Sequence, residues 1–210
     1  MACGCNARQR AAGGLLLEKL GARAQPRIHL TEQASRLYLA LRHRFPRTSG
    51  SEFIVSWRKR LRLSFWLWRK GLLEIVQHGD VTAFGLEDGA LDAVLSLDVL
   101  EHVPDARAAF SELARVITPG GVLVATIPFY EDALQSRQIA GLSAEGTVTF
   151  IGEPEYHGDP LGGGVPCFHH FGWSLLQDLR NAGFGDAAAH RISDATRGLP
   201  HGIWVIVANR

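Results

Sequence analysis

Apolar and polar positions along the chain follow two periods, which predict alternating strands and helices. Short apolar runs such as 122–127 have the length of a buried strand. Phe110, Leu113, Ala114 and Ile117 recur at the i, i+3, i+4, i+7 spacing of one buried helix face. Asp105 precedes that stretch, where its carboxylate can accept the free backbone N–H groups of a helix start. This part of the chain therefore predicts a strand–helix–strand unit.

The same reading predicts the order of the remaining elements. Helices are expected over 11–20, 34–45, 106–117 and 174–182, and strands over 27–32, 49–53, 75–81, 122–127, 187–192 and 203–207. Residues 86–97 are expected to form a polar turn and then a further strand. Residues 54–73 fit either a strand or an amphipathic helix. This order predicts an α/β fold: a Rossmann-like, doubly wound, mostly parallel sheet with a C-terminal antiparallel addition. Ligands of such sheets bind at the carboxyl ends of the strands.

Length and composition point to one folded domain. The chain has 210 residues, of which 46% are hydrophobic and 20% charged, which is ordinary for a globular protein. We expect an N-terminal extension over 1–26 and a single domain over 27–210. No run approaches the ~18 apolar residues of a membrane span, and no apolar segment of the signal-peptide type follows the first basic residues. We therefore expect a cytoplasmic protein.

The net charge of +1 conceals an uneven distribution of charge. Residues 1–78 carry 15 basic and 4 acidic side chains, whereas residues 79–210 carry 7 and 17. Basic residues are densest over 55–70, where Trp57, Trp66 and Trp68 are interleaved with them. Such a segment is typical of a surface element that buries its tryptophan side, or of one that contacts an anionic membrane or a protein partner. Without a nucleic-acid-binding motif, we expect no nucleic acid partner.

The three cysteines indicate a reducing compartment, because an odd number leaves no complete set of pairs. Cys3 and Cys5 stand closer together than the two cysteines of a C-x2-C zinc knuckle. The segment ACGCNARQRA resembles the second half of a Cys-rich stretch that precedes some bacterial methyltransferase domains. Two interpretations stay open: a remnant of a metal site, or an N-terminus with two thiols.

The stretch LDAVLSLDVLEHVPD, followed by a helix and a PGG turn, resembles the class I S-adenosylmethionine-dependent methyltransferases with a type 11-like domain. The resemblance implies S-adenosylmethionine as cofactor. It implies that Glu52 binds the ribose hydroxyls, that Asp80 accepts the adenine amino group, and that Val81 packs on the ring. Asp98 would lie nearest the methyl donor. The cofactor-binding residues implied in all are Thr31, Glu32, Glu52, Asp80, Val81, Leu97, Asp98 and His102.

The first strand departs from the family pattern. The family has a Gly-rich turn there, which lets the backbone approach the methionine part of the cofactor, whereas this chain has IHLTEQASR. A Cβ at Glu32 or Gln33 would crowd that approach. The pattern HLTEQ…LY…GSEF resembles a subgroup of bacterial methyltransferase-like proteins in which this loop is replaced. Thr31 and Glu32 would then either bind the amino group of the cofactor or fill the vacated site.

Residues 153–173 resemble a lid rich in histidines and aromatic residues. His157, His169 and His170 are the candidate catalytic bases. Together with Asp159 they also suggest a metal site, but adjacent histidines on a strand point to opposite faces. We therefore expect substrate-pocket or packing roles for them and no metal. The function predicted is S-adenosylmethionine-dependent methyl transfer to a small molecule; the alternative is a non-catalytic binding or scaffold protein of the same fold.

Overall fold

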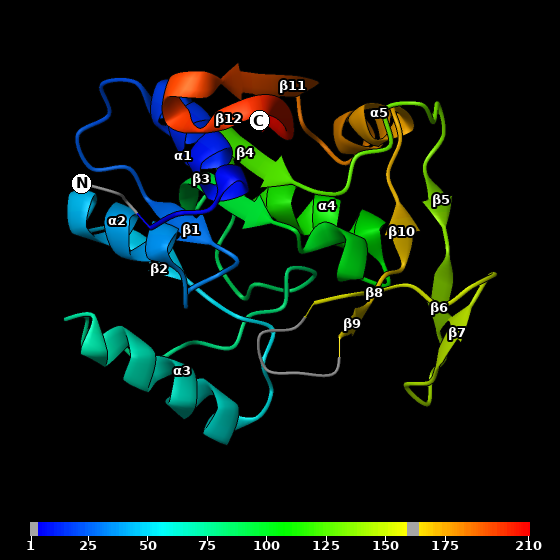
Figure 1. Cartoon of the computed structure of the whole chain (residues 1–210), viewed down its shortest axis with the longest axis horizontal. Helices are drawn as coiled ribbons and strands as arrows, with labels where there is room; N and C mark the ends of the chain where they lie inside the picture. The colour runs from blue at the N-terminus through cyan, green and yellow to red at the C-terminus, as the bar shows by residue number, and fades with distance from the viewer. Residues whose placement is uncertain (1–3, 159–163) are drawn as a thin grey trace.

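A six-stranded sheet forms the centre of the protein, in a computed structural model that describes residues 4–158 and 164–210 (Figure 1). The strand order is β11-β12-β4-β3-β1-β2. Strands β2, β1, β3 and β4 run parallel, and β12 and β11 join as antiparallel neighbours. The predicted Rossmann-like fold with a C-terminal antiparallel addition is confirmed. Cys3 and Asp159, on which two sequence interpretations depended, lie outside the described residues.

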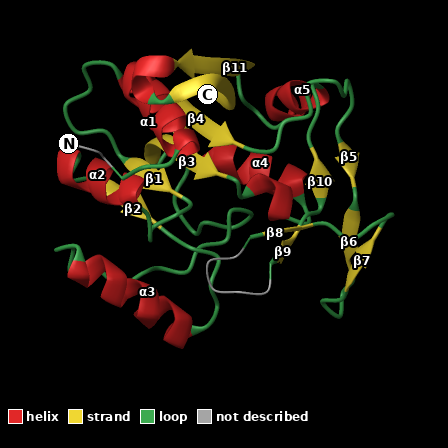
Figure 2. Ribbon diagram, in the orientation of Figure 1, coloured by secondary structure: helices red, strands yellow, loops and turns green. Residues whose placement is uncertain are grey.

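Helices and strands alternate along most of the chain, and Figure 2 distinguishes the two by colour. The helices are α1 (Ala7–Leu20), α2 (Arg36–Arg44), α3 (Trp57–Arg69), α4 (Ala106–Val116) and α5 (Ser174–Asn181), with short 3-10 turns η1 (Leu100–His102) and η2 (Ala195–Arg197). The sheet strands are β1 (Ile28–Leu30), β2 (Thr48–Gly50), β3 (Leu91–Leu97), β4 (Ile117–Thr126), β11 (Asp186–Asp194) and β12 (Leu199–Asn209). Between β4 and α5 lie β5 (Arg137–Gln138), β6 (Ala140–Leu142), β7 (Val148–Phe150), β8 (Tyr156–His157), β9 (Val165–Pro166) and β10 (His169–His170).

The sheet is covered on both faces, and the alternation of side chains along its strands shows this directly. On β4, Leu123 and Ala125 pack in one hydrophobic cluster with α4 and α5, whereas Val122 and Val124 pack in the other with α1 and α2. Successive side chains of a strand point to opposite faces. The two clusters are therefore the two sides of one sheet, and the carboxyl ends of the strands are left for a site.

Helix α1 packs on the sheet as part of the second cluster. Its buried side chains include Leu15, Leu16 and Leu20, which join residues of β1, β3 and β4. The helix begins four residues before the predicted start because Asn6 and Gln9 form a capping box, in which each side chain bonds the backbone of the other. This places the first turn of α1 near the carboxyl ends of β1 and β3.

The strand predicted over 75–81 does not form; a single bridge between Glu52 and His78 stands in its place. The backbone of Glu52 pairs with that segment, whereas side chains satisfy the N–H groups before it: Ser64 Oγ accepts from Val76 N (2.8 Å), and Gln33 Oε1 accepts from Gln77 N (2.7 Å). The apolar pattern of the segment reflects burial of single residues such as Val76. Sequence periodicity cannot distinguish that arrangement from a strand.

The ambiguous segment 54–73 contains helix α3, which lies beside the main body of the fold in Figure 1. Only Ser64 and Leu67 of this helix are buried. Residues 130–172, between β4 and α5, contain three two-stranded pairs: β5 with β10, β6 with β7, and β8 with β9. Within the described residues, no helix has both the length and the apolar character needed to cross a membrane.

Candidate cofactor site and lid

Acidic side chains follow three neighbouring parallel strands at the same edge of the sheet. Glu32 comes after β1, Glu52 after β2, and Asp98 directly after β3. Asp98 has a φ of +52°, the one positive value among the described non-glycine residues. Its backbone N–H donates to the Thr126 carbonyl (2.8 Å) and its carboxylate accepts from Thr126 Oγ1 (3.0 Å). Strand β4 thus holds Asp98 at the strand end where ligands of this fold class bind.

These acids form a row in which each carboxylate raises the pKa of the next. Burial raises the pKa of Glu52 to about 7, with a further contribution from the charge of Glu32. Burial also raises the pKa of Glu32 and that of Asp98, and the charge of Asp98 adds to the increase at Glu32. Glu101, in the 3-10 turn after Asp98, has a pKa raised by burial to about 8. Buried neighbouring carboxylates of this kind favour a cation among them.

The first turn of α1 supplies partners to this row. Arg8 forms an ion pair with Asp98, and Gln9 Nε2 donates to Glu32 Oε1 (2.9 Å). Asp98 is 22% exposed and Arg8 52% exposed, so the ion pair is open to solvent on the arginine side. Neither contact was predicted from the sequence, although Arg8 and Gln9 belong to the segment ACGCNARQRA that the sequence analysis singled out. The N-terminal residues therefore belong to the site.

The loop that replaces the Gly-rich turn is held from both sides. Glu52 Oε1 accepts from the backbone N–H of Ala34 (2.7 Å), and Thr31 Oγ1 donates to Ser96 Oγ (3.2 Å). Gln33 is 2% exposed and its side chain bonds the 75–77 backbone, so it points away from Asp98's loop. Glu32 belongs to the acid row and Thr31 contacts Ser96 of β3, and the binding roles expected for both stay predictions.

Asp80 and Val81 lie after the bridge at His78. Asp80 Oδ1 accepts from Thr82 N (2.8 Å) and from Thr82 Oγ1 (2.7 Å), which fixes a local turn and leaves the second carboxylate oxygen for another partner. Val81 is 7% exposed and packs in the α4 cluster, and Leu97 is 6% exposed on the other face. Leu97 is therefore a buried strand residue that orients Asp98, and the adenine contacts of Asp80 and Val81 stay predictions.

The three candidate bases of the lid have different neighbours. His170 Nε2 lies 2.7 Å from Glu155 Oε2, and its ring stacks on Tyr130. His157 Nε2 lies 3.3 Å from Glu155 Oε1. His169 points the other way, with Nε2 3.2 Å from the Pro104 carbonyl oxygen, and burial lowers its pKa.

The predicted divergence of the adjacent pair His169 and His170 is confirmed, and Glu155 joins His157 to His170. The charge of His157 also lowers the pKa of Asp98, so the lid and the acid row lie within electrostatic range. Glu155 was missed in the sequence. The segment EPEYH carries it two residues before His157, a spacing that places both side chains on one face of an extended chain.

His102 lies between the acid row and the lid. Its Nδ1 is 2.8 Å from the Pro166 carbonyl oxygen, its ring meets that of His157 edge to face, and burial lowers its pKa. The backbone N–H of Phe168 donates to the Glu101 carbonyl (2.8 Å), which ties the lid to the loop after β3. His102 therefore contacts the lid, and the cofactor contact predicted for it stays a prediction.

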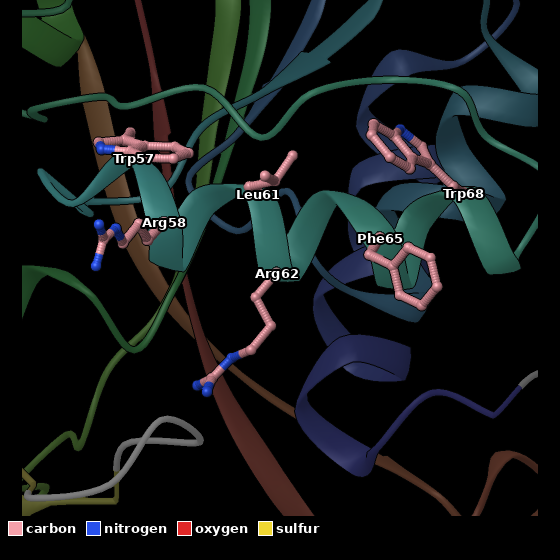
Figure 3. Close-up of a pocket in the computed structure, with 6 residues that line it drawn as sticks. All are labelled: Trp57, Arg58, Leu61, Arg62, Phe65 and Trp68. Atoms are coloured by element: carbon pink, nitrogen blue, oxygen red, sulfur yellow. The ribbon is translucent and has the colours of Figure 1, made fainter.

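A second surface feature lies on α3. Figure 3 shows a shallow groove lined by Trp57, Arg58, Leu61, Arg62, Phe65 and Trp68. Trp57 is 62% exposed and Phe65 is 56% exposed, although both are large apolar side chains. The guanidinium of Arg58 lies over the Trp57 ring. The sequence predicted that a surface element here would bury its tryptophan side; Trp66 is partly buried, whereas Trp57 and Trp68 are exposed.

Part of the chain is similar to known methyltransferases. A methyltransferase domain family matches residues 53–125. A probable S-adenosylmethionine-dependent methyltransferase of Mycolicibacterium smegmatis is 36% identical over 53 residues, 25% of this chain and 21% of that protein. The matches to the first curated relatives span 16% to 29% of their length.

Two solved structures share the fold. The 1,6-didemethyltoxoflavin-N1-methyltransferase of Burkholderia thailandensis, with S-adenosylhomocysteine bound, has a TM-score of 0.56 at 18% identity, over 97% of this chain and 78% of that one. A cyclase of the 4+2 type has a TM-score of 0.62 at 17% identity, over 100% and 85%. The family match over residues 53–125 and the shared fold show that this chain is similar to S-adenosylmethionine-dependent methyltransferases.

Proposed function

We propose that this chain binds S-adenosylmethionine at the carboxyl ends of β1, β2 and β3 and transfers its methyl group to a small-molecule acceptor. The observation that carries the proposal is the row of Glu52, Glu32 and Asp98, whose pKa values are all raised. A ligand with a sulfonium and an ammonium group complements such a row, because each positive charge relieves the repulsion between carboxylates.

Each acid has a proposed role in binding. Glu52 would accept hydrogen bonds from both ribose hydroxyls, which suits a carboxylate because its two oxygens can be used at once. Glu32 would bind the amino group, in place of the Gly-rich turn that the chain lacks. The free oxygen of Asp80 would accept from the adenine amino group, and Asp98 would line the methionine part.

The cofactor, when bound, supplies an electrophilic methyl group that an acceptor atom attacks in line with the departing sulfur. The chain's own residues would position that acceptor, exclude water and remove a proton from a nitrogen or oxygen nucleophile. His170 is the better placed base of the β10 pair, because its Nε2 lies 2.7 Å from Glu155 Oε2 and this contact orients the ring. His169 is bonded to the Pro104 carbonyl and faces away from Glu155.

Calorimetric titration of the purified protein with S-adenosylmethionine and S-adenosylhomocysteine tests the proposal. We expect binding at micromolar to high-micromolar level, and a weakening of about 1–3 kcal/mol when Asp80→Ala removes one hydrogen bond to a charged group. His170→Ala should leave the affinity unchanged because His170 belongs to the lid. No binding at millimolar cofactor would contradict the proposal.

The second candidate is a non-catalytic binding protein of the methyltransferase fold, and one observation favours it. Arg8 and Gln9 already pair with Asp98 and Glu32, so two of the acids have partners from the chain itself. A cyclase with this fold also shows that the fold alone does not define methyl transfer. Cofactor binding without turnover, across a panel of nitrogen, oxygen and carbon acceptors, would favour this candidate.

We also propose that α3 contacts an anionic membrane surface. The helix carries exposed Arg58, Lys59 and Arg62 beside exposed Trp57 and Phe65, and no acidic residue lies within Trp57–Arg69. Apolar side chains that enter the headgroup region and cations that attract anionic lipids are the two contributions to interfacial binding. A protein partner with an acidic surface is the other outcome of the test argued below.

A further inference from the structure

A cluster of ligand-type side chains lies where the lid meets the loop after β3. His102 comes from η1, His157 from β8, and Cys167 from the turn between β9 and β10. One ligand atom of each lies within 4.8 Å of those of the other two. Cys167 is 1% exposed and His157 is 32% exposed, so the cluster is buried on the thiol side and open on the imidazole side.

Hydrogen-bond partners indicate which nitrogen of each imidazole carries a lone pair, and Cys167 Sγ lies 3.9 Å from Nδ1 of His102. His102 Nδ1 lies 2.8 Å from the Pro166 carbonyl oxygen, which only accepts, so Nδ1 carries the proton and Nε2 the lone pair. His157 Nε2 lies 3.3 Å from Glu155, which likewise leaves the Nδ1 lone pair on the other side. A carbonyl or a carboxylate behind each ring is the usual support of a metal-binding histidine.

Both lone pairs face the same carboxylate. Glu101 Oε1 lies 3.6 Å from His157 Nδ1 and 3.8 Å from His102 Nε2. The Glu101 side chain is 1% exposed, and neither of its carboxylate oxygens has a hydrogen-bond partner. Burial without partners disfavours the charged form of Glu101, and a bound cation would favour it. The two imidazole nitrogens and the Glu101 carboxyl group lie together with no hydrogen bond to Glu101, an arrangement that a cation would complete.

We propose that His102, His157, Cys167 and Glu101 bind a divalent metal ion of the zinc class. Two imidazoles, one thiol and one carboxylate are ligands that zinc prefers, whereas calcium and magnesium prefer oxygen ligands alone. Four ligand atoms around zinc lie roughly 3.3–3.8 Å apart, as bond lengths of about 2.0–2.3 Å require. The Glu101 distances to the two imidazoles are in that range.

The backbone holds the four ligands in place from both segments. The Cys167 N–H donates to the Glu155 carbonyl (2.9 Å), and the Phe168 N–H donates to the Glu101 carbonyl (2.8 Å). A metal ion here would therefore fasten the lid to the loop that carries Asp98. This revises the expectation of no metal: the histidines of the adjacent pair on β10 are not the ligands, and His102 and Cys167 are.

Titration of the metal-free full chain with Co²⁺ tests the site. The protein is treated with a chelator and a thiol reductant, and Co²⁺ is then added while absorbance is recorded. We expect one equivalent to bind, with a thiolate-to-cobalt band that is lost in Cys167→Ser. Competition with Zn²⁺ should remove the band. His157→Ala should weaken Zn²⁺ binding by at least about 100-fold, since losing even a residue behind a ligand costs ~10–100-fold.

Matched variants separate this site from adventitious binding. His43→Ala removes an exposed histidine of α2, and Cys5→Ser removes the other described cysteine; both should bind as the wild type does. Glu101→Gln preserves the shape of the side chain, and it serves if Cys167→Ser fails to fold by circular dichroism. Wild-type protein that takes up no metal, or uptake that depends on Cys5 rather than on Cys167 and His157, would overturn the proposal.

Discussion

Arg8 has a defined place in the proposed cofactor site because it neutralises Asp98 without being buried itself. The protein therefore carries its own cation at the strand end where the methionine part of a cofactor would lie. A ligand with an additional positive charge competes with Arg8 for the carboxylate of Asp98. A ligand that lacks this charge competes less. S-adenosylmethionine and S-adenosylhomocysteine differ in this way, since only the first carries the sulfonium charge.

Arg8→Ala should therefore strengthen binding of S-adenosylmethionine relative to S-adenosylhomocysteine by about 5-fold. The basis is the loss of one unit charge near the sulfonium, worth about 1 kcal/mol in a solvent-exposed setting. Calorimetric titration of both ligands gives the ratio. Lys19→Ala removes the same charge from the far end of α1 and should not change it. An equal shift in both variants would show that only the net charge matters.

Glu52 should make the stability of the cofactor-free protein depend on pH. Burial raises its pKa from 4.5 to about 7, so the folded state binds this proton more tightly than the unfolded state does. The contribution of Glu52 to stability is therefore greatest below pH 4.5 and is lost as the pH rises to about 7.

Glu52→Gln removes this dependence and keeps an oxygen for the Ala34 N–H. We expect the variant to exceed the wild type in free energy of unfolding by about 1–3 kcal/mol at pH 8, and by little at pH 5. Urea denaturation at both pH values gives the difference. The exposed Glu87, changed to Gln, serves as control. A gain that is the same at pH 5 and pH 8 would show that ionisation of Glu52 is not its cause.

At the scale of elements, strong helical periodicity predicted a helix correctly, whereas a short apolar run predicted a strand that does not form. Helix α4 was found because one face recurs at helical spacing and Asp105 caps it, with Oδ1 accepting from Ala108 N (2.9 Å). The expected strand over 75–81 is wrong because the side chains of Gln33 and Ser64 satisfy that backbone. Those partners come from other elements, so their role cannot be read from the segment itself.

Some residues of the candidate site could likewise be named from the sequence, and others could not. The family resemblance implied Glu32, Glu52 and Asp98, and the structure has them after β1, β2 and β3, whose carboxyl ends share an edge; their binding roles stay predictions. The cluster of His102, Cys167 and Glu101 was missed because the three residues come from segments about 65 positions apart in the chain. A contact between residues so far apart in the chain cannot be read from the sequence, whereas the adjacent pair His169 and His170 is visible in it.

Helix α3 is held to the fold along one narrow side. Ser64 and Leu67 are fully buried, and Ser64 Oγ accepts from the Val76 N–H (2.8 Å). The exposed side, with Trp57 and Phe65, gains no burial within the described part of the chain. Exposed apolar side chains of this kind favour binding to an apolar surface such as a membrane interface. The basic residues beside them favour a surface that carries negative charge.

Changing Arg58, Lys59 and Arg62 together to Gln should abolish binding of the protein to phosphatidylserine-containing vesicles. Each cation near an anionic surface contributes about 1 kcal/mol, so three give roughly 100-fold in affinity. Vesicle flotation measures the bound fraction, with phosphatidylcholine vesicles as the neutral comparison. A Lys substitution at Arg58 and Arg62 keeps the charge and should keep the binding. Equal, negligible flotation of wild type and variant would exclude the membrane and favour an acidic protein partner.

At the scale of the whole molecule, the two hydrophobic clusters share one sheet. Leu16 of α1 and Leu113 of α4 are both 0% exposed and lie in different clusters, on opposite faces. The division predicted from the sequence, with an extension over 1–26 and a domain over 27–210, would let α1 detach without unfolding the rest. Packing of α1 on β1, β3 and β4 favours a single cooperative unit instead.

Leu16→Ala and Leu113→Ala should each lower the free energy of unfolding by about 2–5 kcal/mol, the cost of a cavity at a buried leucine. Because both clusters lie on the same strands, each variant should shift one shared transition. Urea denaturation followed by tryptophan fluorescence and far-ultraviolet circular dichroism checks this, since coincident curves indicate a two-state process. A separate, early transition in Leu16→Ala alone, with Leu113→Ala shifting only the main one, would show that residues 1–26 are an extension that unfolds independently.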